Sequence, residues 1–108
     1  MDVLVRQQRV GRYPVLHVSG EVDLATLPRL ADALTRAVGG PDTVVVDLDG
    51  VLVMDDAGLG LLLGAAGRAR RAGGDVAVVC SSPALREQLA LTGFDRAVRV
   101  VATMSDLA

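Results

Sequence analysis

The segment from residue 44 to residue 63, VVVDLDGVLVMDDAGLGLLL, constrains the fold of this chain more than any other. It begins with three consecutive valines, whose β-branched side chains favour a strand that is covered on both faces. An acidic turn is expected at residues 47–50, followed by the glycine-rich start of an apolar helix. A buried strand that leads into a helix is the repeating unit of parallel α/β sheets. The segment therefore predicts an α/β domain.

Hydrophobic spacing predicts further elements on both sides of this segment. Strands are expected at Val3–Val10, 14–19, 75–80 and 98–101, with a turn at Gly11 between the first two. Helices are expected at 26–38, at 57–72 and from Ser82-Pro83 to Gly93, and a short helix-like tail is expected to end at Ala108. This order predicts a mixed, mainly parallel β-sheet of about five strands with helices packed on it. The length fits a single domain over residues 1–108.

The helix expected at 57–72 is rich in glycine, although an interior glycine weakens a helix by about 0.5–1 kcal/mol relative to alanine. Close packing of this helix on the sheet would explain glycines on one face, and three of them share a face: Gly60, Gly64 and Gly67. The alternative is a smooth docking surface near Gly58 and Gly60. Leu63 is expected in the core with its neighbouring leucines. Ser81 and Ser82 are expected to cap the next helix, and His17 is expected to face outward or to form a hydrogen bond.

Composition excludes several classes of function. Hydrophobic residues make up 51% of the chain, but aromatic residues make up only 2%, which disfavours base stacking. A net charge of -2 and a pI near 5.2 argue against binding to a nucleic-acid backbone. The single cysteine, Cys80, suits a reducing cytoplasm, and no segment is apolar for long enough to insert into a membrane. His17 has no partner at metal-ligand spacing, so neither a metal nor another cofactor is expected.

The acidic turn resembles the nucleophile loop of haloacid-dehalogenase-like phosphatases through Asp47-Leu48-Asp49-Gly50. In that family the first aspartate attacks phosphorus, the second acts as acid and base, and Mg²⁺ neutralises the charge. This chain has no lysine to hold the phosphoryl group, and no second acidic pair on a later strand. A motif without its structural context is weak, so an enzyme that uses Asp47 and Asp49 is the minor alternative.

A second resemblance covers nearly the whole chain. The segment Gly20-Glu21-Val22-Asp23-Leu24, the strand at 44–50 and the turn Met54-Asp55-Asp56-Ala57-Gly58-Leu59-Gly60 are similar, in this order, to motifs of the STAS domain family. Within that family they resemble the anti-sigma factor antagonists. Leu91-Thr92-Gly93-Phe94 is similar to the family's approach to its last strand. The resemblance implies the STAS (SpoIIAA-like) fold.

The resemblance implies a protein-protein switch and no catalytic activity. Its members bind an anti-sigma factor that is also a serine kinase, and thereby regulate sigma-factor-dependent transcription. The kinase phosphorylates the residue after the signature aspartate, at the start of a helix where unpaired N–H groups stabilise an anion. In this sequence the implied partner-binding residues are Glu21, Asp23, Leu24, Asp55, Asp56, Ala57, Gly58 and Leu59.

Asp56 stands at the phospho-acceptor position, where the family carries serine or threonine. An aspartate is not a substrate for a serine kinase, so we expect no phosphorylation switch at this residue. Asp56 either mimics the phosphorylated state and weakens partner binding, or suits a partner that prefers an anion. It also fits a helix N-cap without any partner, and an N-cap at Asp55 is the other possibility.

One further alternative stays within the STAS family. Small STAS proteins also serve as cytosolic subunits of lipid-type membrane transporters, and the missing phospho-acceptor makes this role more plausible. In either case the protein is expected to be cytoplasmic, to bind no nucleic acid, and to be a monomer or a weak dimer.

Overall fold

The fold is a five-stranded sheet covered by helices, and the computed structural model describes residues 2–107 of it. The strands lie in the order β1-β2-β3-β4-β5; β1 is antiparallel to β2, and the remaining pairs are parallel. The elements along the chain are β1 (Val3–Val10), β2 (Tyr13–Val22), α1 (Leu27–Ala37), β3 (Thr43–Met54), α2 (Asp56–Arg71), β4 (Asp75–Val79), α3 (Pro83–Leu91), α4 (Phe94–Ala97), β5 (Arg99–Val101) and the 3₁₀ helix η1 (Met104–Leu107). The predicted mixed, mainly parallel sheet is confirmed.

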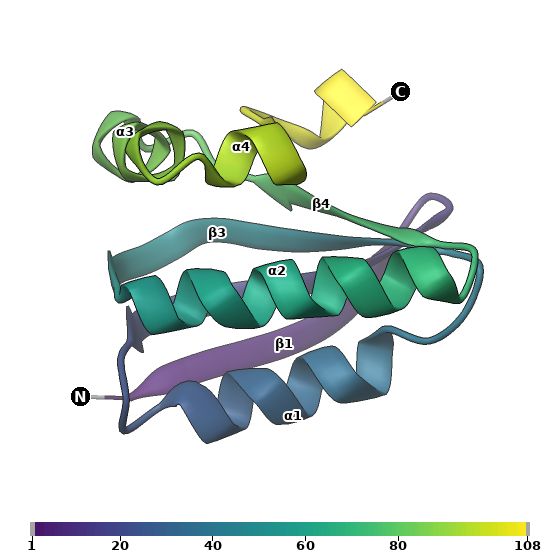
Figure 1. Ribbon diagram of the computed structural model, residues 1–108, viewed down its shortest axis with the longest axis horizontal. Helices are drawn as coiled ribbons and strands as arrows, with labels where there is room; N and C mark the ends of the chain where they lie inside the picture. Colours follow the sequence, from purple (N-terminus) through teal and green to yellow (C-terminus); the bar gives the residue numbers. More distant parts are fainter. Residues whose placement is uncertain (1, 108) are drawn as a thin grey trace.

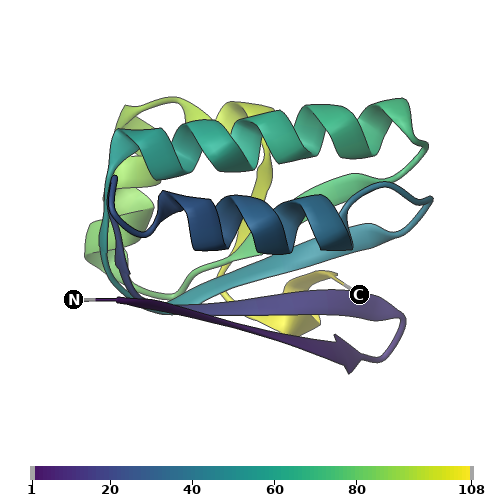
Figure 2. The same cartoon turned by 90° about the horizontal axis from the view of Figure 1, so that it is seen from below.

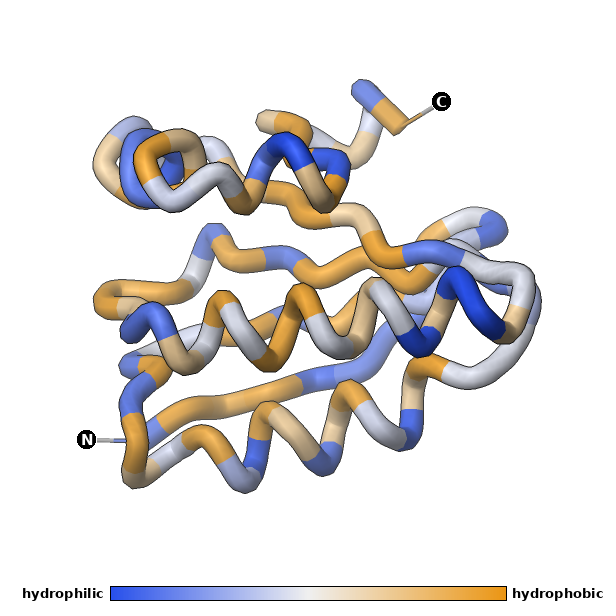
Figure 3. The backbone as a smooth tube through the Cα atoms, viewed as in Figure 1, coloured by the Kyte–Doolittle hydropathy of each residue, from blue (hydrophilic) through white to orange (hydrophobic). Residues whose placement is uncertain are grey.

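Helices α1 and α2 lie side by side on one face of the sheet, and α3 and α4 continue this layer toward β4 and β5 (Figures 1 and 2). The main core fills the space between these helices and the sheet. Its largest fully buried side chains include Leu16, Leu30, Leu34, Leu48, Leu62, Leu89 and Phe94. A smaller cluster on the opposite face includes Val15, Val45 and Leu107, so η1 covers part of that face. Hydrophobic residues run along strands β3 and β4, whereas the second half of β1, toward Val10, is mostly polar (Figure 3).

Local sequence sets the ends of the helices. Pro28 lies in the first turn of α1, where its missing N–H leaves no hydrogen bond unmade. The Ser82 hydroxyl accepts a hydrogen bond from the Leu85 N–H at 3.4 Å, so the predicted cap of α3 is confirmed. Gly93 closes α3 as predicted, with a left-handed φ of 78°. The short helix α4 that follows was not predicted, and the residue at which the tail was expected to end, Ala108, lies outside the described residues.

The expected acidic turn at residues 47–50 is wrong, because β3 continues through it to Met54. Pairing with β2 passes through two register shifts, and at each of them β3 carries one residue more than β2. Gly50 lies at the first shift, where an added Cβ would come within 2.7 Å of the Ser19 Cβ. The aspartate-glycine pattern of a turn therefore serves a β-bulge in this chain.

Close packing of Gly60, Gly64 and Gly67 against the sheet is also wrong. A Cβ at Gly60 would meet no heavy atom within 4 Å, and those at the other two positions would approach only arginine side chains of the same helix. Leu63, expected in the core, is 40% exposed. The apolar face of α2 is instead formed by Leu59, Leu62, Ala65, Ala66 and Ala69.

Candidate partner-binding site

Two segments that lie far apart in the sequence meet where β2 and β3 end. Because these strands are parallel, their carboxyl ends share one edge of the sheet, and Glu21 pairs with Val53 there. The N–H of Asp55 donates a hydrogen bond to the carbonyl of Val22 at 2.9 Å. The loop between β2 and α1 and the turn into α2 therefore form one surface.

The first half of this surface is fastened by Thr26, a residue that the sequence analysis did not single out. Thr26 is only 4% exposed, and its hydroxyl donates to the Glu21 carbonyl at 2.8 Å and accepts from the Asp23 N–H at 3.0 Å. The Asp23 carboxylate accepts from the N–H groups of Ala25 and Thr26. Asp23 thus shapes its own loop, while Leu24 at the tip is 76% exposed. The Asp-x-x-Thr spacing before a proline-containing helix was the signal for this turn.

The second half is the start of α2. Asp55 is the N-cap residue, with extended φ and ψ of -72° and 155°, and its carbonyl accepts from the Gly58 N–H at 2.9 Å. Its side chain makes no capping hydrogen bond. Asp56 is the first helical residue, so the hypothesis that Asp56 is the N-cap is wrong. Its exposed carboxylate lies where the helix dipole stabilises a negative charge.

The implied partner-binding residues divide by burial. Leu24, Asp55, Asp56 and Ala57 are exposed, and Glu21 and Asp23 are half-buried. Gly58 and Leu59 are buried and support this surface from beneath. A Cβ at Gly58 would lie 2.7 Å from Val22 Cγ1, so the missing side chain lets α2 approach β2 closely.

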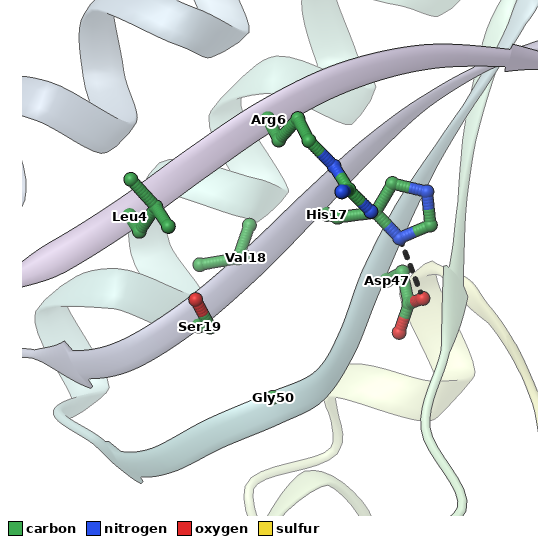
Figure 4. A pocket seen from close by; sticks show the side chains of 7 residues that line it. All are labelled: Leu4, Arg6, His17, Val18, Ser19, Asp47 and Gly50. Atoms are coloured by element: carbon green, nitrogen blue, oxygen red, sulfur yellow. Dashed lines mark hydrogen bonds and ion pairs between the residues drawn. The ribbon is translucent and has the colours of Figure 1, made fainter.

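The acidic pair of β3 lies elsewhere and is engaged within the chain. The carboxylate of Asp47 is 2.9 Å from His17 Nδ1 on the sheet face opposite α1 and α2, beside a hollow that is lined by Arg6 and Gly50 (Figure 4). The prediction that His17 faces outward or forms a hydrogen bond is confirmed.

Asp49 is tied to the end of β4. One of its carboxylate oxygens accepts from both the N–H and the hydroxyl of Ser81, at 2.7 and 3.0 Å. The prediction that Ser81 caps α3 is wrong, because its N–H and hydroxyl bind Asp49 and the N-cap residue is Ser82. Across residues 2–107 no three His, Cys, Asp or Glu side chains are grouped as metal ligands would be. No helix in the same range is both long and apolar enough to cross a bilayer.

The sequence profile of the STAS domain family matches residues 4–107. The chain belongs to the STAS domain family. This STAS domain is 32% identical over 95 residues to the anti-sigma-F factor antagonist RsfB of Mycobacterium tuberculosis. The aligned region covers 85% of this chain and 75% of RsfB.

Solved structures agree with this assignment. The crystal structure of an anti-sigma factor antagonist from Mycobacterium paratuberculosis superposes with a TM-score of 0.86 and 29% identity, over 96% of this chain and 89% of that one. Unphosphorylated SpoIIAA, an anti-sigma factor antagonist, superposes with a TM-score of 0.70 and 22% identity, over 96% and 92% of the two chains. The SpoIIAA-like fold is therefore confirmed.

Proposed function

We propose that this STAS domain is an anti-sigma factor antagonist. It binds an anti-sigma factor that is also a serine kinase, and thereby regulates sigma-factor-dependent transcription in the cytoplasm. The observation that carries the proposal is the similarity to RsfB, which extends over 85% of the chain. The candidate site supports it, since the two segments that the family resemblance implicates meet at one edge of the sheet.

The binding surface comprises the exposed Leu24, Asp55, Asp56 and Ala57, with Glu21 and Asp23 at its margin. Leu24 is a large apolar side chain at the tip of a loop that hydrogen bonds hold in place. Such a side chain gains free energy when a partner covers it, at little cost in loop ordering. The domain, residues 1–108, acts as a monomer or a weak dimer and has no catalytic role of its own.

Phosphorylation at the family's position does not regulate this protein. Asp56 has no hydroxyl group to accept a phosphoryl group from a serine kinase. The anion at the start of α2 is permanent, and the partner meets it in every encounter. Regulation then depends on the amount of the protein or on a different site.

Affinity capture tests the proposal. The tagged protein is used as bait in lysate of its own host, and the captured proteins are identified by mass spectrometry. An anti-sigma factor is expected among them, and the purified factor should bind the wild type directly. Capture of a transporter ATPase or permease in its place would refute the proposal and support the transporter alternative.

A matched pair of variants locates the surface. Leu24→Ser removes an apolar side chain within the site and should weaken binding of the captured factor about tenfold. Leu4→Ser changes a side chain of similar exposure, 67%, on β1 outside the site, and should leave the affinity unchanged. Equal affinities of the two variants would show that the partner binds elsewhere.

A further inference from the structure

An apolar groove lies directly beside the candidate site. It runs between the first turns of α2 and the junction of α3 and α4, and has a volume of about 300 Å³. Leu59 and Phe94 are buried at its base, and Leu63 and Ala97 line its sides. Most of the surface that lines the groove is therefore hydrocarbon.

Missing side chains keep the groove open. Gly60 lines it from α2, and a Cβ there would project into open space with no heavy atom within 4 Å. Gly93 lines it from the junction, at the left-handed residue that ends α3. Gly60 occupies an interior helical position at a cost of about 0.5–1 kcal/mol relative to alanine. Because nothing within the described residues fills the space at Gly60, close packing inside the domain does not explain this glycine.

The groove also contains one charged side chain. Asp56 is the charged residue that lines it, and among residues 2–107 its carboxylate has no cationic partner within 4 Å. The guanidinium of Arg96 lies near Gly93, at the junction of α3 and α4, and forms no ion pair with Asp56. An apolar channel with an unpaired carboxylate fits a side chain that has a hydrocarbon stem and a cationic head.

We propose that this groove receives an arginine or lysine side chain of the anti-sigma factor, with its stem against Leu59 and Leu63 and its charge against Asp56. The proposal rests on the proposed function and specifies how the partner is recognised. It assigns Asp56 an attractive role. Of the interpretations that the sequence left open, it favours a partner that prefers an anion over a phosphate mimic that weakens binding.

Binding of the captured, purified anti-sigma factor to four variants tests this, with isothermal titration calorimetry as the readout. Asp56→Asn keeps the shape of the side chain and removes its charge, and should weaken binding about tenfold or more. Gly60→Leu fills the groove from a position with room for the side chain, and should weaken binding by a similar factor. Gly67→Leu makes the same change two turns further along α2, outside the groove, and should bind as the wild type does. Arg96→Gln should not weaken binding.

Salt dependence provides a second readout. Wild-type affinity should fall as ionic strength rises, and Asp56→Asn should show a weaker dependence because one ion pair is absent. Wild-type affinity or better in Asp56→Asn, or unchanged binding by Gly60→Leu, would overturn the groove proposal while the proposed function stands. Loss of binding in Arg96→Gln alone would show that the groove recognises an acidic group. If the wild type binds no anti-sigma factor, the proposed function itself fails, and the groove proposal fails with it.

Discussion

Thr26 holds the loop that carries Leu24, and replacing it with valine should destabilise the domain measurably. Valine has nearly the same shape as threonine but lacks the hydroxyl. Thr26→Val therefore removes a donor from the Glu21 carbonyl, 2.8 Å away, and an acceptor from the Asp23 N–H, 3.0 Å away. Both backbone groups then lose a partner close to a side chain that is almost fully buried.

The expected magnitude follows from these two lost partners. A buried polar group left without a hydrogen bond costs about 1–3 kcal/mol. Glu21 and Asp23 are half-buried, so water can reach them in part and the lower end of the range applies to each. The free energy of unfolding should fall by about 2 kcal/mol in total. For a domain of 108 residues that corresponds to a Tm lower by about 9 °C.

Urea denaturation followed by circular dichroism measures this change, and Thr35 supplies the matched control. Thr35 is an exposed threonine of α1 whose hydroxyl donates to the Ala31 carbonyl at 2.9 Å. Thr35→Val should change the free energy of unfolding by less than about 0.5 kcal/mol. If Thr26→Val were as stable as Thr35→Val, the loop would not depend on the Thr26 hydroxyl, and the account of this loop would be refuted.

Two further predictions concern α2 and Cys80, the residue that follows β4. Gly58→Ala should destabilise the domain by about 1–3 kcal/mol because its Cβ would press on Val22. Gly60→Ala should stabilise the domain by about 0.5–1 kcal/mol, because its Cβ has room and alanine favours a helix. Urea midpoints that rank the two variants in the opposite order would contradict the packing of α2. Burial raises the pKa of the Cys80 thiol above its ordinary value, so folding favours the protonated form. The stability that this provides is complete below the pKa of the unfolded chain, about 8.5, and is lost as pH rises from there through the folded pKa. Thermal unfolding at pH 7.5 and 9.5 should therefore show a larger fall in Tm for the wild type than for Cys80→Ala, and equal falls would count against the burial effect.

The general fold could be predicted because most of its elements follow periodic patterns. The consecutive valines of β3 and the regularly spaced apolar residues of α1 are the residues of these elements that are buried in the hydrophobic core. Pro28 and Ser82 correctly predicted where helices begin, and Gly93 correctly predicted where one ends. These signals are local, and local signals suffice where packing agrees with them.

The parts that could not be predicted depend on tertiary pairing. Whether the aspartates and Gly50 form a turn or a bulge is decided by how β2 pairs with β3, and the sequence of β3 alone does not contain that information. The face of α2 that packs on the sheet is set in the same way. Gly60 and Leu63 therefore line the groove instead of packing in the main core, although their spacing also suited a packed face.

The candidate site shows the same division. The family motifs identified both of its segments, but the structure separates the exposed Asp56 from the buried Gly58, which the sequence had grouped together. Asp55 and Asp56 are neighbours at the start of α2, and by propensity either aspartate could be the N-cap. Backbone conformation decides the matter in favour of Asp55.

The proposed antagonism of an anti-sigma factor can be measured in a displacement assay. The captured anti-sigma factor is first bound to its sigma factor, and the purified STAS domain is then added while the free sigma factor is measured. We expect sigma factor to be released in proportion to added wild-type domain, and Leu24→Ser to require about tenfold more protein for the same release. A sigma factor that stays bound at saturating wild-type domain would contradict the proposed antagonism.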